Sequence, residues 1–175
     1  MASTKWIIDP THSEVTFKVK HLMISTVTGN FKIFEGTVET ETEEFKKVKK
    51  LEFKADVKSV NTNNKDRDDH LRSDDFFASE RHPEIRFTAK NFNLKTGKIK
   101  GELTIRKTTK PVSLDVNFGG EAVDPYGQRR AGLTANGKIS RKKFGLIWNS
   151  VTEAGNVLVG DQIRLVAEVQ FIKQA

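Results

Sequence analysis

The sequence predicts an all-β fold: an eight-stranded antiparallel barrel with an apolar central channel and one short surface helix around residues 61–77. Apolar and polar residues alternate along almost the whole chain, as in strands that have one buried and one wet face. Turn motifs separate the strands closely, and short connections imply antiparallel neighbours. One polar segment breaks the alternation, and it provides the helix.

The first predicted strand carries Val15, Phe17 and Val19 on its buried side and lysines on the other. Residues 31–41 form the second strand. Six more segments alternate in the same way: 51–57, 85–89, 99–105, 112–118, 133–139 and 163–171.

Turn motifs and phase changes support this strand count. Residues 95–98, KTGK, resemble a type I turn closed by a glycine bulge, and residues 124–127, DPYG, have the proline and glycine positions that a type I turn prefers. The alternation changes phase after Ile33 and again after Ala89. We interpret both changes as β-bulges, which help a sheet to curl closed.

The predicted helix lies in NTNNKDRDDHLRSDDFF, residues 61–77. Asn and Thr stand at a plausible N-cap, acidic residues fill the first turns, and only Leu71, Phe76 and Phe77 are apolar anchors. Pro83 ends any helix before the next strand begins. We therefore expect one polar surface helix or two short ones.

Strands with one apolar face must stack as two sheets or close on themselves. A closed barrel of eight strands is just wide enough to be filled by side chains or to hold one small ligand. The inward positions mix phenylalanines with small residues, and we expect the small ones to leave room: Ala55, Ala89, Gly101, Ala131, Ala135, Gly137 and Ala167.

Composition limits the function classes. The 175 residues suggest a single domain, 1–175, and the absence of cysteine excludes disulfides, thiolate metal sites and cysteine nucleophiles. The net charge of +7 comes from lysines spread along wet strand faces without aromatic partners, which argues against nucleic-acid binding. No stretch has the length of a membrane span or a signal peptide. We expect a cytoplasmic protein, or a periplasmic one if an export signal has been removed.

Neither a catalytic nor a metal site is predicted. Asp66, Asp68, Asp69 and His70 fit a solvated, capped helix better than a metal site, because only one pair has i, i+4 spacing. Asp9, His12 and Ser13 are triad residue types, but sequence neighbours do not make triad geometry. We therefore expect no enzyme activity and no cofactor.

Three residues have two interpretations each. His21 shares the phase of Val15, Phe17 and Val19, so we expect it to point inward near the rim, either as a hydrogen-bonded rim residue or as a donor to a lipid head group. Phe144 and Trp148 either plug one end of the barrel or contact a ligand.

Four stretches of the chain resemble the YceI-like family of polyisoprenoid-binding, lipocalin-like proteins. They are WIIDPTHSEVTFKVKHLMISTVTGNF, LRSDDFFASERHPEIRFTA, GELTIRKTTKPVSLDV and SRKKFGLIWN, and the similarity runs from Trp6 to about Phe171. Their order and spacing are specific, although one stretch alone would be weak. Many relatives carry an export signal, and this chain shows none.

The resemblance implies a barrel whose channel holds an isoprenoid quinone or another extended amphiphilic lipid. It also gives a reason for the adjacent Leu22, Met23 and Ile24, which cannot all point inward from one strand. They would line or cover the channel mouth, with Gly29-Asn30 turning into the second strand. The expected channel lining is Phe17, Val19, His21, Leu22, Met23, Ile24, Phe31, Phe53, Phe76, Phe87, Leu103, Phe118, Ala135, Phe144 and Trp148.

The predicted function is therefore binding, storage or transport of a polyisoprenoid without chemical conversion. Three alternatives stay open at this point: a carrier of shorter amphiphiles such as fatty acids or fatty amides, a filled barrel with a regulatory or interaction role, and an enzyme acting on a lipid. The expected partner is a long-chain isoprenoid lipid, with no nucleic acid and no integral membrane segment. Transient membrane contact and a homodimer are further options.

Overall fold

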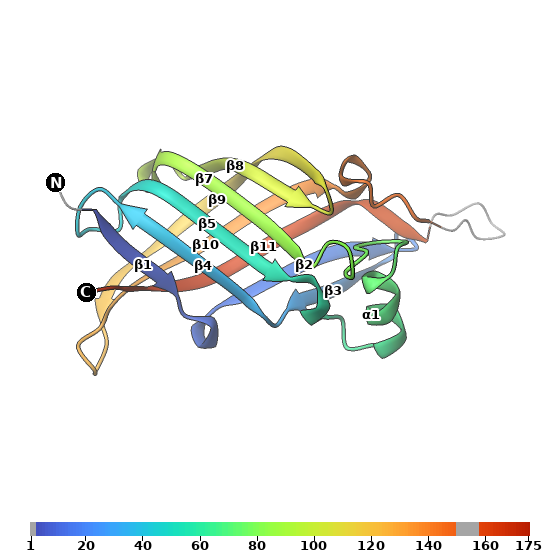
Figure 1. The fold of residues 1–175 in the computed structure, drawn as a ribbon, viewed down its shortest axis with the longest axis horizontal. Helices are drawn as coiled ribbons and strands as arrows, with labels where there is room; N and C mark the ends of the chain where they lie inside the picture. Colours follow the sequence, from blue (N-terminus) through green and yellow to red (C-terminus); the bar gives the residue numbers. More distant parts are fainter. Residues whose placement is uncertain (1–2, 150–157) are drawn as a thin grey trace.

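The computed structural model describes residues 3–149 and 158–175, which form an elongated barrel of strands with helix α1 at one end (Figure 1). The strands are β1 (Thr4–Ile8), β2 (Glu14–His21), β3 (Ser25–Phe31), β4 (Phe34–Thr40), β5 (Lys47–Asp56), β6 (Val60–Asn61), β7 (Glu84–Asn93), β8 (Lys98–Ile105), β9 (Thr108–Val123), β10 (Arg129–Ser140) and β11 (Val159–Lys173). The helical segments are α1 (Lys65–Arg72) and the 3-10 turns η1 (Pro10–His12), η2 (Val57–Ser59), η3 (Leu94–Thr96) and η4 (Arg141–Phe144).

Eight strands close the barrel. They follow the order β1-β4-β5-β7-β8-β9-β10-β11, and β11 pairs back to β1, where Ile8 lies opposite Phe171. Each of these pairings is antiparallel. The predicted all-β, eight-stranded antiparallel barrel is confirmed.

Strands β1 and β2 both pair with the same edge of β11. Residues 171–173 pair with β1, and residues 159–168 pair with β2, so β1 and β2 act as one long barrel strand interrupted by η1. In the same way β3 pairs with β2 while β4 pairs with β1. The short β6 extends the sheet beyond β3, and α1 packs beside it at this end of the barrel (Figure 1).

Three strands are absent from the sequence-based prediction: β1, β3 and the two-residue β6. The N-terminal residues of β1 carry only a short alternation, and β3 has a largely polar sequence in which Val27, Gly29 and Phe31 are the more buried positions. Gly29 and Asn30, expected to form a turn, lie inside β3. The chain turns earlier, at residues 22–24, where His21 pairs with Ser25.

The predicted phase changes have two different causes. Between Phe31 and Phe34 the chain bends and passes from β3 to β4, so the expected bulge there is a break between strands. In β7, Asn91 adopts a left-handed φ of 50°, which re-aims the strand after Ala89. Both predicted turns are present: Gly97 has a φ of 71°, and the Gly127 amide donates to the Asp124 carbonyl at 3.0 Å.

The helix is shorter than predicted. Its N-cap is Asn64, whose side chain accepts a hydrogen bond from the Arg67 amide at 3.0 Å, and it ends at Arg72. Phe76 and Phe77 therefore follow the helix, on a turn-rich segment, and still pack against the core. Within the described residues, no helix is long and apolar enough to span a membrane.

Large side chains lie across the interior glycines. The ring of Phe17 covers Gly29, the ring of Phe87 covers Gly101, and Leu114 covers Gly137. The expectation that Gly101 and Gly137 leave free space is therefore wrong, because a neighbouring strand fills each position.

Candidate functional site

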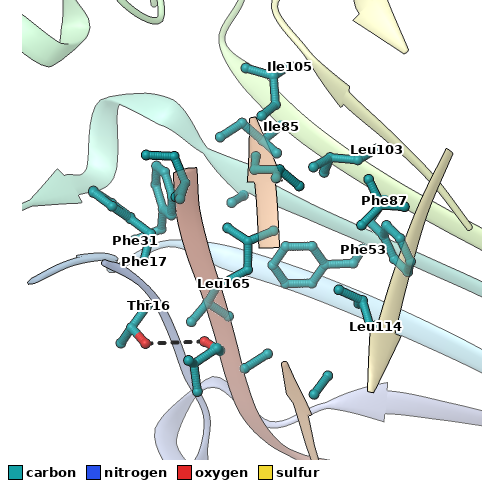
Figure 2. A pocket seen from close by; sticks show the side chains of 18 of the residues that line it. Thr16, Phe17, Phe31, Phe53, Ile85, Phe87, Leu103, Ile105, Leu114 and Leu165 are labelled. Carbon is teal, nitrogen blue, oxygen red and sulfur yellow. Dashed lines mark hydrogen bonds between the residues drawn. The ribbon is translucent and has the colours of Figure 1, made fainter. Parts of the chain in front are cut away.

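A cavity of about 220 Å³ lies inside the barrel. Figure 2 shows ten labelled residues of its wall, among them Phe53, Phe87 and Leu165. Its wall is almost entirely hydrocarbon. Thr16 uses its hydroxyl to donate to the Val166 carbonyl at 3.2 Å, and the exposed Glu52 side chain pairs with Lys50. The cavity can therefore solvate an apolar chain but offers little to a polar one.

An aromatic plug closes one end of the barrel. Phe45, on the loop between β4 and β5, is 4.9 Å from Trp6, 5.5 Å from Phe171 and 5.9 Å from Phe118, measured between ring centroids. Trp6 and Phe45 are fully buried, and the Trp6 indole donates to Thr40 Oγ1 at 3.1 Å. Trp6 and Phe45 do not border the cavity, which therefore ends before this plug.

Two chain segments cover the other end of the cavity. Leu71, Phe76 and Phe77, from α1 and the turns after it, border the cavity on one side. Arg141 and Leu146, from η4 and the residues after it, border the cavity on another. Ligand access at this end requires these segments to separate.

The two covering segments contact each other, and one residue of the barrel rim, Arg106, binds both of them. The ring of His70 is 4.6 Å from that of Trp148 and 5.0 Å from that of Phe76, and both pairs meet edge to face. From the β8–β9 hairpin, Arg106 donates to the Phe76 and Gly145 carbonyls, each at 3.3 Å. These contacts hold the cover shut.

Arg141 is the one buried cation that borders the cavity among the described residues. Its guanidinium donates to the carbonyls of Gly160, Leu146, Trp148 and Val159 at 2.6–3.1 Å. Burial lowers the pKa of Arg141, and the charge of Asp161 opposes that shift. The side chain ties η4 and the residues after it to the start of β11.

Eight of the residues predicted to line the channel border the cavity. They come from six strands and the covering segment: Phe17, Val19, Phe31, Phe53, Phe76, Phe87, Leu103 and Ala135.

Seven predicted residues lie elsewhere. His21, Met23 and Ile24 are exposed, and Leu22 is partly buried, at the β2–β3 turn. His21 does not point inward as expected, although it still pairs with Val159 of β11 and Ser25 of β3; the register between β2 and β11 shifts just before this residue, between Val159 and Ile163. Phe118 belongs to the aromatic plug, and Phe144 and Trp148 pack in the cover.

Sequence reasoning missed several wall residues. Ile8 lies on the unpredicted β1, and Leu146 follows η4. Arg141 was missed because all its acceptors are backbone carbonyls, and two of them lie on β11, which is distant in sequence. Leu71 and Phe77 were predicted as apolar anchors of the helical segment. Their apolar character within a polar segment was the sequence signal that they pack inward.

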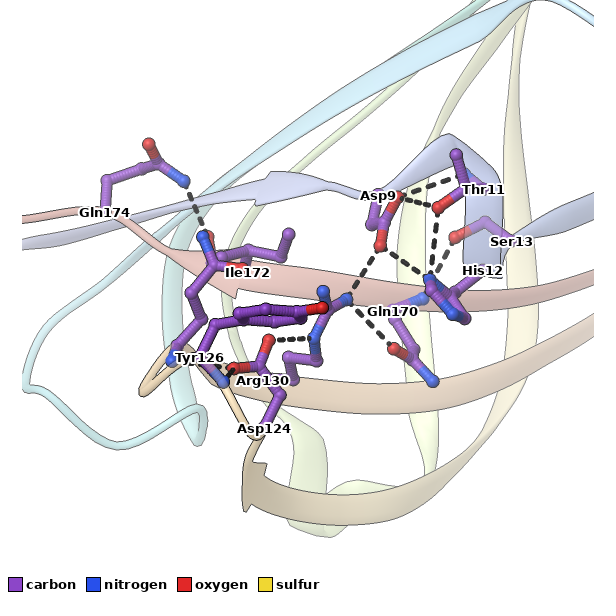
Figure 3. A network of polar contacts seen from close by, with 11 residues as sticks. Asp9, Thr11, His12, Ser13, Asp124, Tyr126, Arg130, Gln170, Ile172 and Gln174 are labelled. Carbon is purple, nitrogen blue, oxygen red and sulfur yellow. Dashed lines mark hydrogen bonds and ion pairs between the residues drawn. The ribbon is translucent and has the colours of Figure 1, made fainter.

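The triad residue types form a structural network on the β1–β2 connection (Figure 3). Asp9 accepts from Arg130 at 2.7 Å and lies 2.8 Å from His12 Nδ1, while the Ser13 hydroxyl accepts from the Gln170 amide. Burial alone would raise the pKa of Asp9, but the hydrogen bonds from Arg130, Thr11 and His12 outweigh it and hold that pKa well below its ordinary range. The network ties the β9–β10 turn to β1 and β11.

The acidic residues of α1 also have structural partners. Asp68 is buried and accepts from the amide and hydroxyl of Thr62, and Asp69 pairs with Lys65 and Arg72. His70 lies 2.8 Å from Asp75. Within the described residues, no cluster of three or more acidic or histidine side chains could hold a metal ion.

Comparison with known proteins identifies the family. The model of the YceI-like domain matches residues 6–171. A UPF0312 protein of Staphylococcus epidermidis is 36% identical over 171 residues, which cover 96% of this chain and 97% of that protein. A UPF0312 protein of Staphylococcus aureus is 34% identical over the same length.

Solved structures share the fold. The YceI protein of Campylobacter jejuni is 34% identical, with a TM-score of 0.72 over 89% of this chain and 90% of that one. A polyisoprenoid binding domain from Saccharophagus degradans has a TM-score of 0.74 at 14% identity, over 97% of this chain and 98% of that one. At that identity the second likeness shows the fold alone.

Proposed function

We propose that this chain, which belongs to the YceI-like domain family, binds one apolar lipid chain inside its barrel and carries or stores it without chemical conversion. The observation that carries the proposal is the cavity wall, whose side chains offer hydrocarbon from the plug to the cover. Arg141, the buried cation at this wall, already donates to four carbonyls.

Burial of apolar surface is then the driving force. At about 25 cal/mol per Å², a chain that buries several hundred Å² gains on the order of 10 kcal/mol before the costs of ordering. Affinity should rise with the length of apolar chain that fits, and the head group should contribute less.

We propose a polyisoprenoid, such as a polyprenyl lipid or an isoprenoid quinone, as the preferred chain. Val159 and Phe171 both border the cavity from β11, and the twelve steps of strand between these two residues span about 40 Å at about 3.3 Å each. A wall this long suits an extended chain. The polyisoprenoid binding named for the Saccharophagus degradans domain supports the same ligand class.

A shorter amphiphile, such as a fatty acid or a fatty amide, is the second candidate. The cavity of about 220 Å³ is below the roughly 300–1,000 Å³ of sites for drug-sized ligands, so a long chain must displace wall side chains or the cover. A short chain needs less displacement, and this volume favours it.

Mass spectrometry of an organic extract of the protein, purified from its native host, tests the proposal. A co-purifying prenyl chain supports the polyisoprenoid, and a co-purifying fatty acid or amide supports the second candidate. Titration of the delipidated protein with prenyl alcohols and fatty acids of increasing length then ranks the two classes. An extract without lipid, together with no binding in the titration, would overturn both.

A further inference from the structure

Three large apolar side chains stand exposed at the covered end of the barrel. Met23 is 57% exposed, Ile24 is 82% exposed and Ile147 is 69% exposed. Met23 and Ile24 form the β2–β3 turn, and Ile147 lies between Leu146 and Trp148 of the cover. We call these three side chains the apolar tip.

The start of β11 joins the parts of the apolar tip. The Leu22 amide donates to the Leu158 carbonyl at 2.9 Å, and Met23 Sδ lies 3.6 Å from where a Cβ on Gly160 would stand. On the other side, Arg141 binds the Val159 and Gly160 carbonyls together with those that flank Ile147. Figure 1 shows the end of β2, the starts of β3 and β11, and α1 at the same end of the barrel.

Turn geometry does not explain the large residues in this turn. Leu22 and Met23 have φ values of 52° and 61°, a region that glycine and asparagine adopt easily and large apolar residues adopt at a cost. Solvent exposure of Met23 and Ile24 adds a further cost, because their apolar surface stays in water. A surface that binds apolar matter would offset both costs.

Among the described residues, three exposed lysines lie beside the apolar tip. Lys20, Lys142 and Lys143 are exposed beside it, and the ion pairs of the described residues involve other lysines, such as Lys58 and Lys65. The neighbouring carboxylate, Asp161, accepts hydrogen bonds from the Ser140 hydroxyl and the Lys142 amide. Exposed lysines that form no close ion pair among the described residues, beside exposed apolar side chains, complement an anionic lipid surface.

We propose that the apolar tip docks the protein on an anionic lipid bilayer. Met23, Ile24 and Ile147 enter the boundary between head groups and acyl chains, and the three lysines lie against the phosphates. The cover of the cavity is at this same end, so docking brings the cover to the bilayer. The inference goes beyond the proposed function, because docking does not depend on which chain the barrel holds.

Sedimentation with vesicles tests the docking. Wild-type protein should sediment with phosphatidylcholine vesicles that contain phosphatidylglycerol and much less with phosphatidylcholine alone. The double variant Met23→Ser, Ile24→Ser should lower the partition coefficient about a hundredfold, since each large apolar side chain buried contributes roughly a factor of ten. Ile147→Ser should lower it about tenfold.

Val123→Ser is the matched control, because Val123 is 67% exposed at the β9–β10 turn, at the other end of the barrel. It should bind vesicles as wild type does, and thermal melts should show that all variants fold. Replacing Lys20, Lys142 and Lys143 by glutamine should weaken binding most at low salt.

Three results would overturn docking by the apolar tip: no wild-type binding to anionic vesicles, equal loss in Val123→Ser, or loss in the lysine variant alone. Loss in the lysine variant alone would mean that the positive charge of the protein attracts it to anionic vesicles without help from the apolar tip. Lipid uptake in the absence of vesicles is a separate readout, so failure of docking and failure of the proposed function are distinguishable.

Discussion

The ring of Phe87 lies against Gly101 on the neighbouring strand, with its Cζ 2.6 Å from where an alanine Cβ would stand at that position. The backbone carbonyl of Thr88 limits the same space. The glycine thus sets how deeply the ring can sit in the barrel wall, and Phe87 in turn borders the cavity. Gly101, which has no side chain, therefore leaves the space that the Phe87 ring occupies in the cavity wall.

Gly101→Ala should destabilise the protein by about 1–3 kcal/mol, because the new methyl group overpacks the wall and Thr88 O is backbone. Urea unfolding measures this. Gly132→Ala is the control, since its nearest neighbour to a new Cβ is at 3.9 Å and its φ is not positive. Equal stability of Gly101→Ala and wild type would contradict the packing described here.

Ala135→Trp should reduce lipid binding, because Ala135 borders the cavity and a large side chain there occupies the ligand's space. The unfolding free energy should change less than for Gly101→Ala, since free volume is available. Asn136→Trp places the same side chain on the next residue of β10 and should bind lipid as wild type does. Titration with a fluorescent prenyl lipid measures binding. Full binding by Ala135→Trp would mean that the ligand lies elsewhere.

Local alternation was enough to predict much of the barrel. Phe17, Phe87 and Leu103 were expected to face inward because side chains alternate between the two faces of a strand, and they border the cavity. The β9–β10 turn followed from its proline and glycine. These features depend on short stretches of sequence.

Features set by distant partners could not be predicted. Phe118 has the inward phase, but the register shifts where Gly120 and Phe118 face Gly132 and Leu133. Its ring stacks on the outer side of Phe45 and remains 40% exposed. Gly101 gave the appearance of free space because the sequence does not show which neighbour covers it. The ligand-binding role of the wall residues stays a prediction until lipid binding is measured.

Asp9 should make stability depend on acid pH. Its pKa is lowered in the folded protein, so its contribution is present above the unfolded value of about 3.9 and is lost as the pH falls towards the folded value. Asp9→Asn should cost about 1–2 kcal/mol at neutral pH, because it weakens charge-assisted hydrogen bonds that water partly reaches. Its stability should also fall less steeply in acid than that of wild type.

Urea unfolding between neutral pH and pH about 3 measures this difference, across the range in which an ordinary aspartate titrates. Asp115→Asn is the control, because Asp115 is exposed and lies 3.9 Å from its lysine partner. Parallel pH curves for wild type and Asp9→Asn would show that the network does not anchor the β1–β2 connection.

Trp148→Ala should speed the release of a bound lipid. Trp148 joins the two covering segments through His70 and Phe76, at centroid distances of 4.6 and 5.4 Å. Each aromatic pair contributes about 0.5–1.5 kcal/mol, so losing both contacts should raise the dissociation rate about fivefold to a hundredfold. The cavity wall itself is unchanged at positions such as Phe53 and Ala135, so the association rate should rise as well and the affinity should change less than either rate.

Stopped-flow transfer of a fluorescent prenyl lipid to acceptor vesicles measures both rates. Tyr126→Ala is the control, because Tyr126 is 90% exposed at the β9–β10 turn. Release at the wild-type rate would place the exit away from this cover, and the plug around Phe45 would then be the end to open.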